Sequence, residues 1–528
     1  MAGAYDWNFG DLLDATAANV PGDRPALIRG NRVISWAAFD ARTNRLARAM
    51  RARGLEPGTR VAILARNIPE FIEIAAACFK ARLTHVNINY RYTTAEIGYV
   101  LADCQAGALF YQAEFAAAVA PLFDDLPHLR VGVRIGGDDD QYDALVDAGD
   151  GSPLGIARSP DDGYLLYTGG TTGKPKGVMW RSADARRSQL EAPTIRRVIA
   201  DMADHVDSVA NNPLPGRCIP ACPLMHGAGL NSSMAELLGG GTAILLPSDR
   251  FDAEELWDEV ARNAATRVLI VGDVFARPMV QALERHPDRW DLSSMRVISS
   301  AGLMWSREVK QALVAAMPQV TLVDILGASE ASGFGYAITT ATRETPTGYF
   351  EPGRHTVLID ADTDRVLADD EVGEGWLARR PPIAMGYHGD PAKTASVYRT
   401  IDGQIYAIPG DMAARGADGR LHLLGRGNMC INSGGEKIFV EEVEEAVKRA
   451  PGIEDAMVVG VPDPTWGRVV VALVRPGAGY DEAAVRGAIA GELAAYKLPK
   501  RIVTLDALPR HASGKGDYRR AQEMAAIH

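Results

Sequence analysis

The chain has 528 residues, and its 56 lysines and arginines against 67 aspartates and glutamates give a formal net charge of −11 at pH 7. Apolar residues make up 47% and charged residues 23%, which is ordinary globular usage and excludes global disorder, collagen and a long coiled coil. So acidic a chain lacks the overall basic field of a non-specific nucleic-acid or membrane binder, although a local basic pocket for a phosphorylated ligand remains compatible with it. At about 150 residues per domain, this length predicts roughly three or four folding units.

The five cysteines are scattered along the sequence, and their odd number argues against a complete disulfide framework. We therefore expect reduced, buried thiols at Cys78, Cys104, Cys218, Cys222 and Cys430. The sequence has no signal-peptide pattern at its start, no run of about 18 apolar residues and no lipidation motif at its end. These features predict a soluble cytoplasmic protein.

Short apolar runs alternate with segments of helical spacing through the first three quarters of the chain. The runs are apolar on both faces, as expected for strands that helices cover on both sides. They are residues 60–65, 163–168, 241–246, 267–272, 296–300 and 321–325. Helices are expected between them, for example over 254–263 and 308–316. The alternation predicts the α/β class, with layered subdomains and mostly parallel sheets.

After about residue 425 the pattern changes to that of a small α+β module of about 100 residues. Helices are expected over 441–449 and 481–496, strands over 456–461, 469–474 and 501–505, and a polar tail after Pro509. Glycines around residue 425 allow large changes of backbone dihedrals there. We therefore predict a large domain over 1–425, a hinge at 426–428 and a small domain over 429–528.

The strongest motif is the glycine-rich stretch Tyr167–Gly177, which follows an apolar strand. Its glycines allow backbone N–H groups to approach an anion, and its threonines and lysines add donors and charge. This composition predicts a cradle for a polyphosphate. It is not the P-loop of nucleotide hydrolases, because only residues 170–172 separate Gly169 from Gly173, and Pro175 follows Lys174. A flexible linker is the alternative, but linkers rarely combine threonine pairs with Lys-Pro-Lys.

At this loop the sequence resembles the adenylate-forming superfamily, which comprises acyl-CoA synthetases, luciferase-like enzymes and adenylation domains of peptide synthetases. The resemblance extends over nearly the whole chain, since further blocks recur in the family's order. It implies ATP, Mg²⁺ and coenzyme A, and a small C-terminal domain that is mobile. It also implies that the loop holds the phosphates, through Thr168 (also a catalytic residue), Gly169, Gly170, Thr171, Thr172, Gly173 and Lys174.

Two further blocks follow predicted strands, where ligands collect in open α/β sheets. The resemblance implies that they bind the nucleotide through Ala301, Gly302, Asp324, Gly327, Ala328 and Ser329. Glu330 is implied as a catalytic carboxylate and Mg²⁺ ligand, although by itself it is more simply interpreted as a solvated side chain. Leu326 stands where the family usually has a tyrosine.

The expected acid pocket is lined by small residues. By itself His226 is more often a structural histidine, but the resemblance implies a catalytic and substrate-binding role for it. The implied substrate-binding residues are His226, Gly227, Gly302, Gly327 and Gly333. No lysine or arginine occurs in the three wall segments (residues 225–229, 300–304 and 327–335) to pair with a second carboxylate. We therefore expect a medium- or long-chain fatty acid, a steroid side-chain acid or an aryl-alkanoic acid.

The remaining blocks lie toward the C-terminus. The resemblance implies that Asp411 and Arg426 bind the ribose, that Asn428 is the hinge residue and that a thiol channel runs along Gly434, Gly435, Glu436 and Lys437. Lys515 by itself would be a solvated charge near the chain end. The resemblance makes it the principal catalytic residue, which contacts the substrate carboxylate and the α-phosphate and stabilises charge there.

Together these features predict an ATP-dependent acid–thiol ligase that forms an acyl-adenylate, releases pyrophosphate and transfers the acyl group to coenzyme A. Alternatives are an adenylating enzyme that loads a separate carrier protein, a luciferase-like oxygenase and a non-catalytic nucleotide-binding protein. The expected partners are a carboxylic acid, ATP and CoA, with no nucleic acid and no transmembrane segment. Formation of a homodimer is left open.

Overall fold

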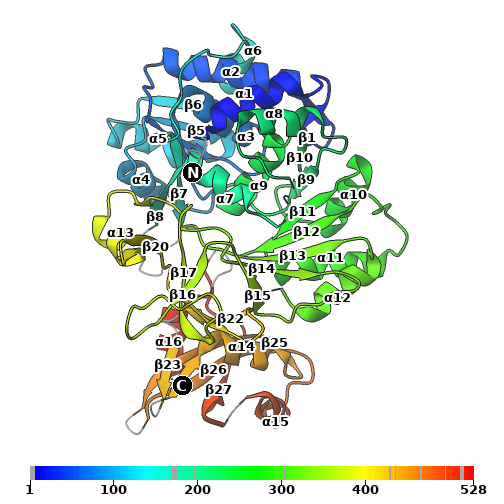
Figure 1. Cartoon of the computed structure of the whole chain (residues 1–528), viewed down its shortest axis with the longest axis vertical. Coiled ribbons are helices and arrows are strands. Elements are labelled where there is room, and N and C mark those ends of the chain that lie inside the picture. The colour runs from blue at the N-terminus through cyan, green and yellow to red at the C-terminus, as the bar shows by residue number, and fades with distance from the viewer. Residues whose placement is uncertain are drawn as a thin grey trace. The chain divides into compact units, whose positions relative to one another are not determined.

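The structure is a computed structural model that describes residues 6–168, 175–193, 195, 197–302, 305–426, 430–433, 436–463, 466–493, 495–511 and 516–527. The chain divides into two units (Figure 1). The first unit comprises residues 1–356 and 379–407, and the second comprises residues 357–378 and 408–528. The sequence-based limits 1–425 and 429–528, with a hinge at 426–428, stay a prediction.

The first sheet of the first unit has the strand order β18-β8-β7-β4-β3-β5-β6. Its strands are β3 Arg60–Leu64, β4 Thr84–Asn87, β5 Ala108–Gln112, β6 Val131–Ile135, β7 Gly163–Thr168, β8 Lys176–Arg181 and β18 Gly386–Tyr387. The central pairs β4·β7, β3·β4, β3·β5 and β5·β6 are parallel, while β8 is antiparallel to both β7 and β18. Residues 61–64 are fully buried, which confirms a strand that is covered on both faces.

The second sheet runs in the order β15-β14-β13-β12-β11-β9-β10-β1-β2 within the first unit. Its strands are β1 Pro25–Arg29, β2 Arg32–Ser35, β9 Arg217–Pro220, β10 Thr242–Leu245, β11 Arg267–Ile270, β12 Val297–Ala301, β13 Thr321–Leu326, β14 Gly335–Thr339 and β15 Tyr349–Pro352. The six neighbouring strands β13, β12, β11, β9, β10 and β1 are parallel. Strands β2, β14 and β15 are antiparallel to their neighbours and lie at the two edges. The predicted mostly parallel sheets are therefore confirmed.

Helices cover these sheets. They are α1 Phe9–Asn19, α2 Trp36–Ala52, α3 Pro69–Ala81, α4 Thr94–Asp103, α5 Ala116–Asp125, α6 Tyr142–Asp147, α7 Ser182–Leu190, α8 Met202–Ala210, α9 Gly227–Leu238, α10 Ala253–Asn263, α11 Asp273–Arg285, α12 Arg307–Ala316 and α13 Pro391–Val397. Figure 1 shows α10, α11 and α12 beside β11–β13. Asp252 caps α10 by accepting from two of its first N–H groups, and the helix buries Leu256, Trp257 and Val260 in the core of this sheet. A short hairpin, β19 Tyr398–Ile401 and β20 Gln404–Ala407, completes this unit.

The second unit contains β16 Thr356–Ile359 and β17 Gly373–Arg379, except for Thr356 and Arg379, which belong to the first unit. It also contains β21 Asp411–Arg415 and β22 Leu421–Arg426, followed by the α+β module. The module consists of β23 Cys430–Ser433, β24 Glu436–Phe439, α14 Val440–Arg449, β25 Ile453–Asp463, β26 Gly467–Pro476, α15 Glu482–Glu492, β27 Arg501–Thr504 and α16 Tyr518–Ile527. Strands β25, β26 and β27 form one sheet in that order. The buried residues of α14 and α15, such as Val443 and Ile489, pack against this sheet.

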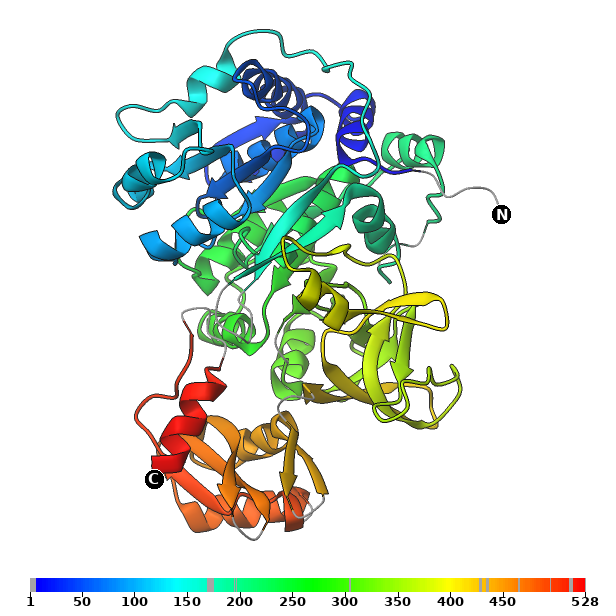
Figure 2. The same cartoon turned by 90° about the vertical axis from the view of Figure 1, so that its left-hand side faces the viewer.

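Two sequence-based expectations for this module were wrong. Helix α15 ends at Glu492, because Leu493 is extended at ψ 144°, so the helix does not reach residue 496. The expected polar tail contains helix α16, whose Ala521 and Ala525 are fully buried against Met457 and Val459 of β25. Figure 2 shows this C-terminal helix beside the strands. Two small residues one turn apart provide a narrow apolar face that hydropathy alone does not reveal.

Cys78, Cys104, Cys218 and Cys222 are buried and unbridged, as expected, and burial raises the pKa of each thiol. The side chain of Cys430 lies outside the described residues. Among the helices that the structure describes, none has both the length and the apolar character required to cross a bilayer.

Candidate functional site

The glycine-rich loop connects two strands of the first sheet. Strand β7 ends at Thr168, β8 begins at Lys176, and these two residues are directly opposite in the antiparallel pair. The predicted phosphate-binding residues Gly169, Gly170, Thr171, Thr172, Gly173 and Lys174 lie outside the described residues. A strand–loop–strand connection differs from the strand–loop–helix of a P-loop. The structure therefore confirms that the loop is not a P-loop.

Glu330 lies in the segment that joins β13 to β14, and neighbours from the first sheet hold that segment. The Tyr387 hydroxyl donates to Glu330 Oε1. The backbone N–H of Ala384 donates to the Glu330 carbonyl at 3.1 Å, and Trp180 Nε1 donates to the Ser329 carbonyl at 2.8 Å. The carboxylate predicted to bind Mg²⁺ is thus held next to β8, the strand that leaves the glycine-rich loop.

The predicted nucleotide residues lie at the carboxyl ends of adjacent parallel strands. Ala301 of β12 is the partner of Ile325 in β13, and Gly302 follows at φ +89°. Asp324, in β13, forms an ion pair with Lys310 of α12 at 3.0 Å. Burial nevertheless raises the pKa of Asp324 to about 6, against the usual 3.8. Gly327 and Ala328 follow directly after β13. Leu326, the last residue of β13, pairs through its backbone with Gly335, and its side chain is aliphatic where the family usually has a tyrosine.

Of the predicted acid-pocket residues, His226 and Gly227 lie at the start of α9, and Gly333 lies in the segment between β13 and β14. His226 is exposed at the N-cap position of α9, and a Cβ at Gly227 would lie 2.9 Å from Leu166 Cδ1 of β7. Gly333 is buried at φ +75°, and a Cβ there would lie 2.4 Å from Tyr336 Oη. Glycine at 333 is thus required by its backbone and by its neighbour. Sequence reasoning did not anticipate this constraint.

A buried cation reaches this wall from outside the three segments considered in the sequence. Arg379 Nη1 donates to the Gly333 carbonyl at 2.8 Å, and Arg379 is 1% exposed. Its other nitrogen Nη2 pairs with Glu191, which His355 Nε2 also contacts at 2.9 Å. The three segments themselves contain no basic residue, as the sequence showed, but the fold brings Arg379 to the wall from another strand. Because Glu191 neutralises the guanidinium, the argument against a dicarboxylic acid still holds.

In the second unit, Asp411 and Arg426 are paired residues of the antiparallel strands β21 and β22. Asp411 follows Gly410 at φ +100°, a conformation that favours glycine. The two residues predicted to bind one ribose thus lie opposite each other on adjacent strands. The side chain of Arg426 lies outside the described part of the structure.

The other C-terminal predictions fall largely on residues that the structure does not describe. Gly434, Gly435, Asn428 and Lys515 lie outside the described residues. Glu436 and Lys437 are in β24, where their backbones pair with Ser433 and Asn432 of β23. On either side of Lys515, Arg510 and Gly516 form a backbone bridge. The thiol channel and the catalytic lysine stay predictions.

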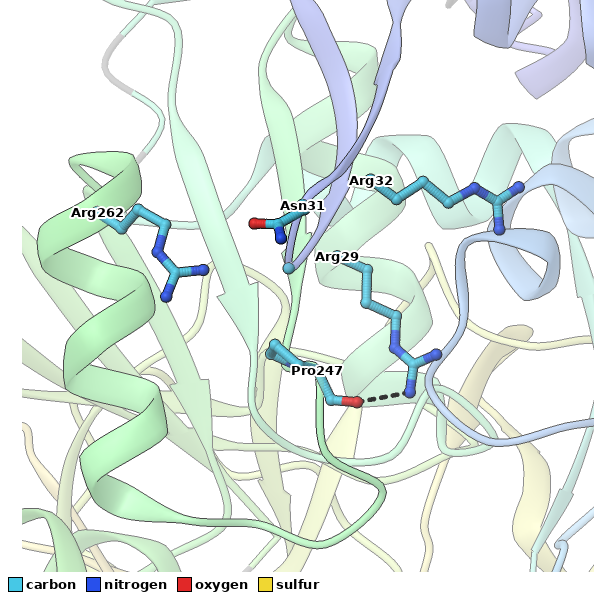
Figure 3. Close-up of a pocket in the computed structure, with 6 residues that line it drawn as sticks. Arg29, Asn31, Arg32, Pro247 and Arg262 are labelled. Carbon is cyan, nitrogen blue, oxygen red and sulfur yellow. Dashed lines mark hydrogen bonds between the residues drawn. The ribbon is translucent and has the colours of Figure 1, made fainter.

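A separate surface pocket of about 520 Å³ lies at the β1–β2 turn (Figure 3). None of the predicted site residues lines it. It is lined by Arg29, Gly30, Asn31, Arg32, Pro247 and Arg262. Figure 3 shows Arg29 directed toward the Pro247 carbonyl, to which it donates at 2.7 Å. Each arginine also has an acidic partner, respectively Asp249, Glu70 and Glu259. The paired charges leave little excess positive charge to attract an anion.

Comparisons with known proteins identify the family. The sequence matches the family described as "AMP-binding enzyme" over residues 13–388 and the "AMP-binding enzyme C-terminal domain" over residues 442–515. It is 38% identical to the medium-chain acyl-CoA ligase Mig of Mycobacterium avium, with 97% of each chain covered. It is 36% identical to a medium/long-chain-fatty-acid–CoA/3-oxocholest-4-en-26-oate–CoA ligase of Mycobacterium marinum, covering 98% of this chain and 96% of that one. The chain therefore belongs to the AMP-binding enzyme family, in its acyl-CoA synthetase branch.

The fold agrees with that assignment. The structure of ATP-bound MatB from Rhodopseudomonas palustris matches with a TM-score of 0.82 and 24% sequence identity, over 98% of this chain and 99% of that chain. The predicted fold class, a large α/β domain with a smaller C-terminal α+β domain, is thus confirmed. The predicted acid–thiol ligase class is confirmed by the curated CoA ligases.

Sequence reasoning missed Tyr387, Arg379, Lys310 and the Lys176–Asp390 pair. Lys176 and Asp390 lie 2.8 Å apart although they are far apart in the chain. The sequence around Tyr387, with glycines at 386 and 389, indicates a turn but does not point to Glu330. Contacts of this kind depend on which strands pair, which no local pattern reports.

Proposed function

We propose that the protein is an ATP-dependent acyl-CoA ligase whose acid is a medium- or long-chain fatty acid or a steroid side-chain acid. The main support for this proposal is that the chain is similar, over nearly its whole length, to ligases named for such acids. The small residues of the wall segments support it, because they leave volume for a large acyl group. We also propose that the protein is located in the cytoplasm, where ATP and CoA are both available.

Two half-reactions are proposed. In the first, a carboxylate oxygen attacks the α-phosphorus of ATP, the P–O bond to the β-phosphate breaks, and acyl-AMP and pyrophosphate form. In the second, the CoA thiolate attacks the acyl carbon and AMP leaves, which yields the thioester. Most of the catalysis in such a reaction is positioning and charge stabilisation rather than covalent chemistry by the protein.

The chain's residues divide the task by ligand group. We propose that Thr168 and residues 169–174 bind the phosphates and that Asp411 and Arg426 bind the ribose. Ala301 and Gly302 form the adenine-binding turn, and Asp324, Gly327, Ala328 and Ser329 also bind the nucleotide. His226, Gly227, Gly302, Gly327 and Gly333 line the acid site, and Lys515 neutralises charge at the α-phosphate. Gly434, Gly435, Glu436 and Lys437 line the thiol path. These assignments follow the family resemblance.

Glu330 fits a role toward Mg²⁺. Among the described residues, no cluster of three or more histidine, cysteine, aspartate or glutamate side chains could hold a metal ion by itself. Mg²⁺ is commonly held by one or two carboxylates together with substrate phosphates and water, so one carboxylate beside a phosphate loop suffices. The bound ion would neutralise charge on the phosphates, while Glu330 keeps one oxygen available because Tyr387 engages the other.

A pyrophosphate-release screen tests the proposal, with octanoate, palmitate, 3-oxocholest-4-en-26-oate and ferulate as acids. Release that depends on a fatty or steroid acid, followed by thioester formation with CoA, is the expected result. Ferulate is the contrasting acid because a feruloyl-CoA synthase of Amycolatopsis sp. is also similar, at 32% identity over 94% of this chain and 95% of that one. Acid-dependent release without any thioester would favour a carrier-loading enzyme or an oxygenase, and no release with any acid would overturn the proposal.

A further inference from the structure

The short segment that contains β18 and the start of α13 contacts both parts of the candidate ATP site within the first unit. Its backbone pairs with β8, since Gly386 lies opposite Met179 and Tyr387 opposite Val178. The His388 N–H extends this pairing by donating to the Gly177 carbonyl at 2.8 Å. The segment is therefore attached to the strand that leaves the glycine-rich loop.

On one side of this segment, Tyr387 holds the carboxylate of Glu330. Tyr387 is 6% exposed, and its hydroxyl donates to Glu330 Oε1. The nearby Tyr398 hydroxyl contacts the Glu330 backbone carbonyl at 3.4 Å rather than the carboxylate. A carboxylate has two oxygens, so the phenol orients the group through Oε1, and none of the described residues hydrogen-bonds to Oε2, where a ligand could bind.

On the other side, Asp390 holds the lysine at the base of the loop. Asp390 Oδ2 lies 2.8 Å from Lys176 Nζ, and this hydrogen bond lowers the pKa of the Asp390 carboxyl. The other carboxylate oxygen caps α13 by accepting from the Lys393 N–H at 2.8 Å. Lys176 is itself paired with Thr168 across the β7–β8 strands.

The conformation of the backbone between these two contacts is fixed by close packing and hydrogen bonds with Thr394. Gly386 has φ +144°, and a Cβ there would lie 2.5 Å from Thr394 Cγ2. The Thr394 hydroxyl oxygen accepts from the Tyr387 N–H at 2.9 Å and donates to the Asp390 carbonyl at 2.8 Å. One threonine of α13 thus sets the spacing between Tyr387 and Asp390.

We propose that Tyr387 and Asp390 act as a bracket, two positioning residues on one rigid segment that set both ends of the ATP·Mg²⁺ site. Tyr387 orients Glu330 toward the metal ion, and Asp390 keeps Lys176 at the base of the phosphate loop. The bracket rests on the proposed function, because it takes Glu330 as the metal ligand and the loop as the phosphate cradle. Residues that orient a metal ligand commonly change metal affinity 10–100-fold when they are removed.

The first test is Tyr387→Phe, which removes the hydroxyl and keeps the buried ring. Titrating Mg²⁺ into enzyme with a fluorescent ATP analogue should show an affinity for Mg²⁺ about 10-fold weaker than in the wild type. Tyr398→Phe is the matched control, because it removes a hydroxyl from the same tyrosine pair without touching the carboxylate. We expect its Mg²⁺ affinity to stay within about twofold of the wild type, because its 3.4 Å contact is long for a hydrogen bond and reaches the backbone carbonyl.

Glu330→Gln separates the possible failures. If Glu330→Gln weakens Mg²⁺ binding and Tyr387→Phe does not, the positioning role of Tyr387 is wrong while the proposed function stands. If neither variant changes Mg²⁺ binding, both the bracket and the metal role of Glu330 are wrong. Wild-type protein that binds no ATP·Mg²⁺ at all would instead overturn the proposed function.

The second test is Asp390→Asn, which keeps a good N-cap for α13 but removes the charge that pairs with Lys176. At saturating Mg²⁺, binding of the ATP analogue should weaken about twofold to fivefold, the range expected for a partly exposed ion pair. Asp369→Asn, at an exposed position of the second unit, controls for the change in net charge. Equal ATP affinity in Asp390→Asn and the wild type would remove Asp390 from the bracket.

Discussion

Replacing Gly333 by alanine should destabilise the first unit for two separable reasons. Gly333 has φ +75°, and the left-handed conformation costs a residue with a Cβ about 1–2 kcal/mol. The added Cβ would also lie 2.4 Å from Tyr336 Oη and 3.3 Å from its Cζ, so the Tyr336 ring must shift. Relieving such an overlap costs about 1–3 kcal/mol. The free energy of unfolding should therefore fall by about 2–5 kcal/mol.

A double-mutant cycle with Tyr336→Phe separates these two contributions. Removing the phenolic oxygen eliminates the 2.4 Å overlap and leaves the 3.3 Å approach to Cζ. Tyr336→Phe alone should change stability by less than about 1 kcal/mol. In that background Gly333→Ala should cost only about 1–2 kcal/mol, the backbone part of the penalty.

The assay is urea unfolding followed by tryptophan fluorescence, with the midpoint and slope compared among the four proteins. Two results would refute the predicted overlap. One is a decrease of less than about 1 kcal/mol in the free energy of unfolding on Gly333→Ala. The other is an equal decrease in the wild-type and the Tyr336→Phe backgrounds. The result also decides how the acid pocket can be probed. A bulky side chain at 333 would disrupt the wall before it narrowed the pocket, so acid preference is interpretable only in variants that stay folded.

Three further predictions concern buried charge and the catalytic lysine. Because burial raises the pKa of Asp324 to about 6, the folded state keeps a proton that the unfolded chain loses near its usual 3.8. The free energy of unfolding should therefore fall as pH rises from 4 to 6. In Asp324→Asn, the urea midpoint should depend less on pH over this range. A midpoint that falls more steeply with pH in the variant than in the wild type would contradict the prediction. Burial lowers the pKa of Arg186 to about 10, and no described carboxylate pairs with its guanidinium. Arg186→Met should therefore raise the free energy of unfolding by about 1–3 kcal/mol, measured by thermal or urea unfolding. A lower free energy of unfolding in the variant would disprove this. Lys515→Ala should nearly abolish acyl-AMP formation and spare thioester formation from supplied acyl-AMP, and equal loss of both half-reactions would refute its assigned role.

Much of the fold could be predicted because its strands are buried on both faces. The predicted run 321–325 is β13 Thr321–Leu326, and the predicted helix 254–263 is α10 Ala253–Asn263. Continuous apolar runs and helical spacing are local properties that survive in the folded state. The prediction failed for α16, where the buried face is carried by two alanines that contribute little hydropathy.

The candidate site divides in the same way. The glycine-rich loop was recognisable as a phosphate cradle from its own residue types at short spacing, whereas the roles of Glu330 and Asp411 were implied only by the family resemblance. Tyr387 was not recognisable, since 56 residues separate it from Glu330 and its role depends on β18 pairing with β8. Arg379 was missed for the same reason, because it reaches Gly333 from a different strand.

From the amino-acid order alone followed the α/β class and the resemblance to the adenylate-forming family, because periodicity, turn chemistry and glycine-rich loops are set by a few adjacent residues. The residues expected to bind ATP were implied by that resemblance. The partners of those residues followed from folding. Tyr387 on Glu330, Asp390 on Lys176 and Glu191 on Arg379 are contacts between segments far apart in the sequence, and Lys310 on Asp324 joins helix α12 to the strand that follows it. Charge and hydrogen bonding act through space at about 3 Å, so only the arrangement of the sheets could bring these groups together.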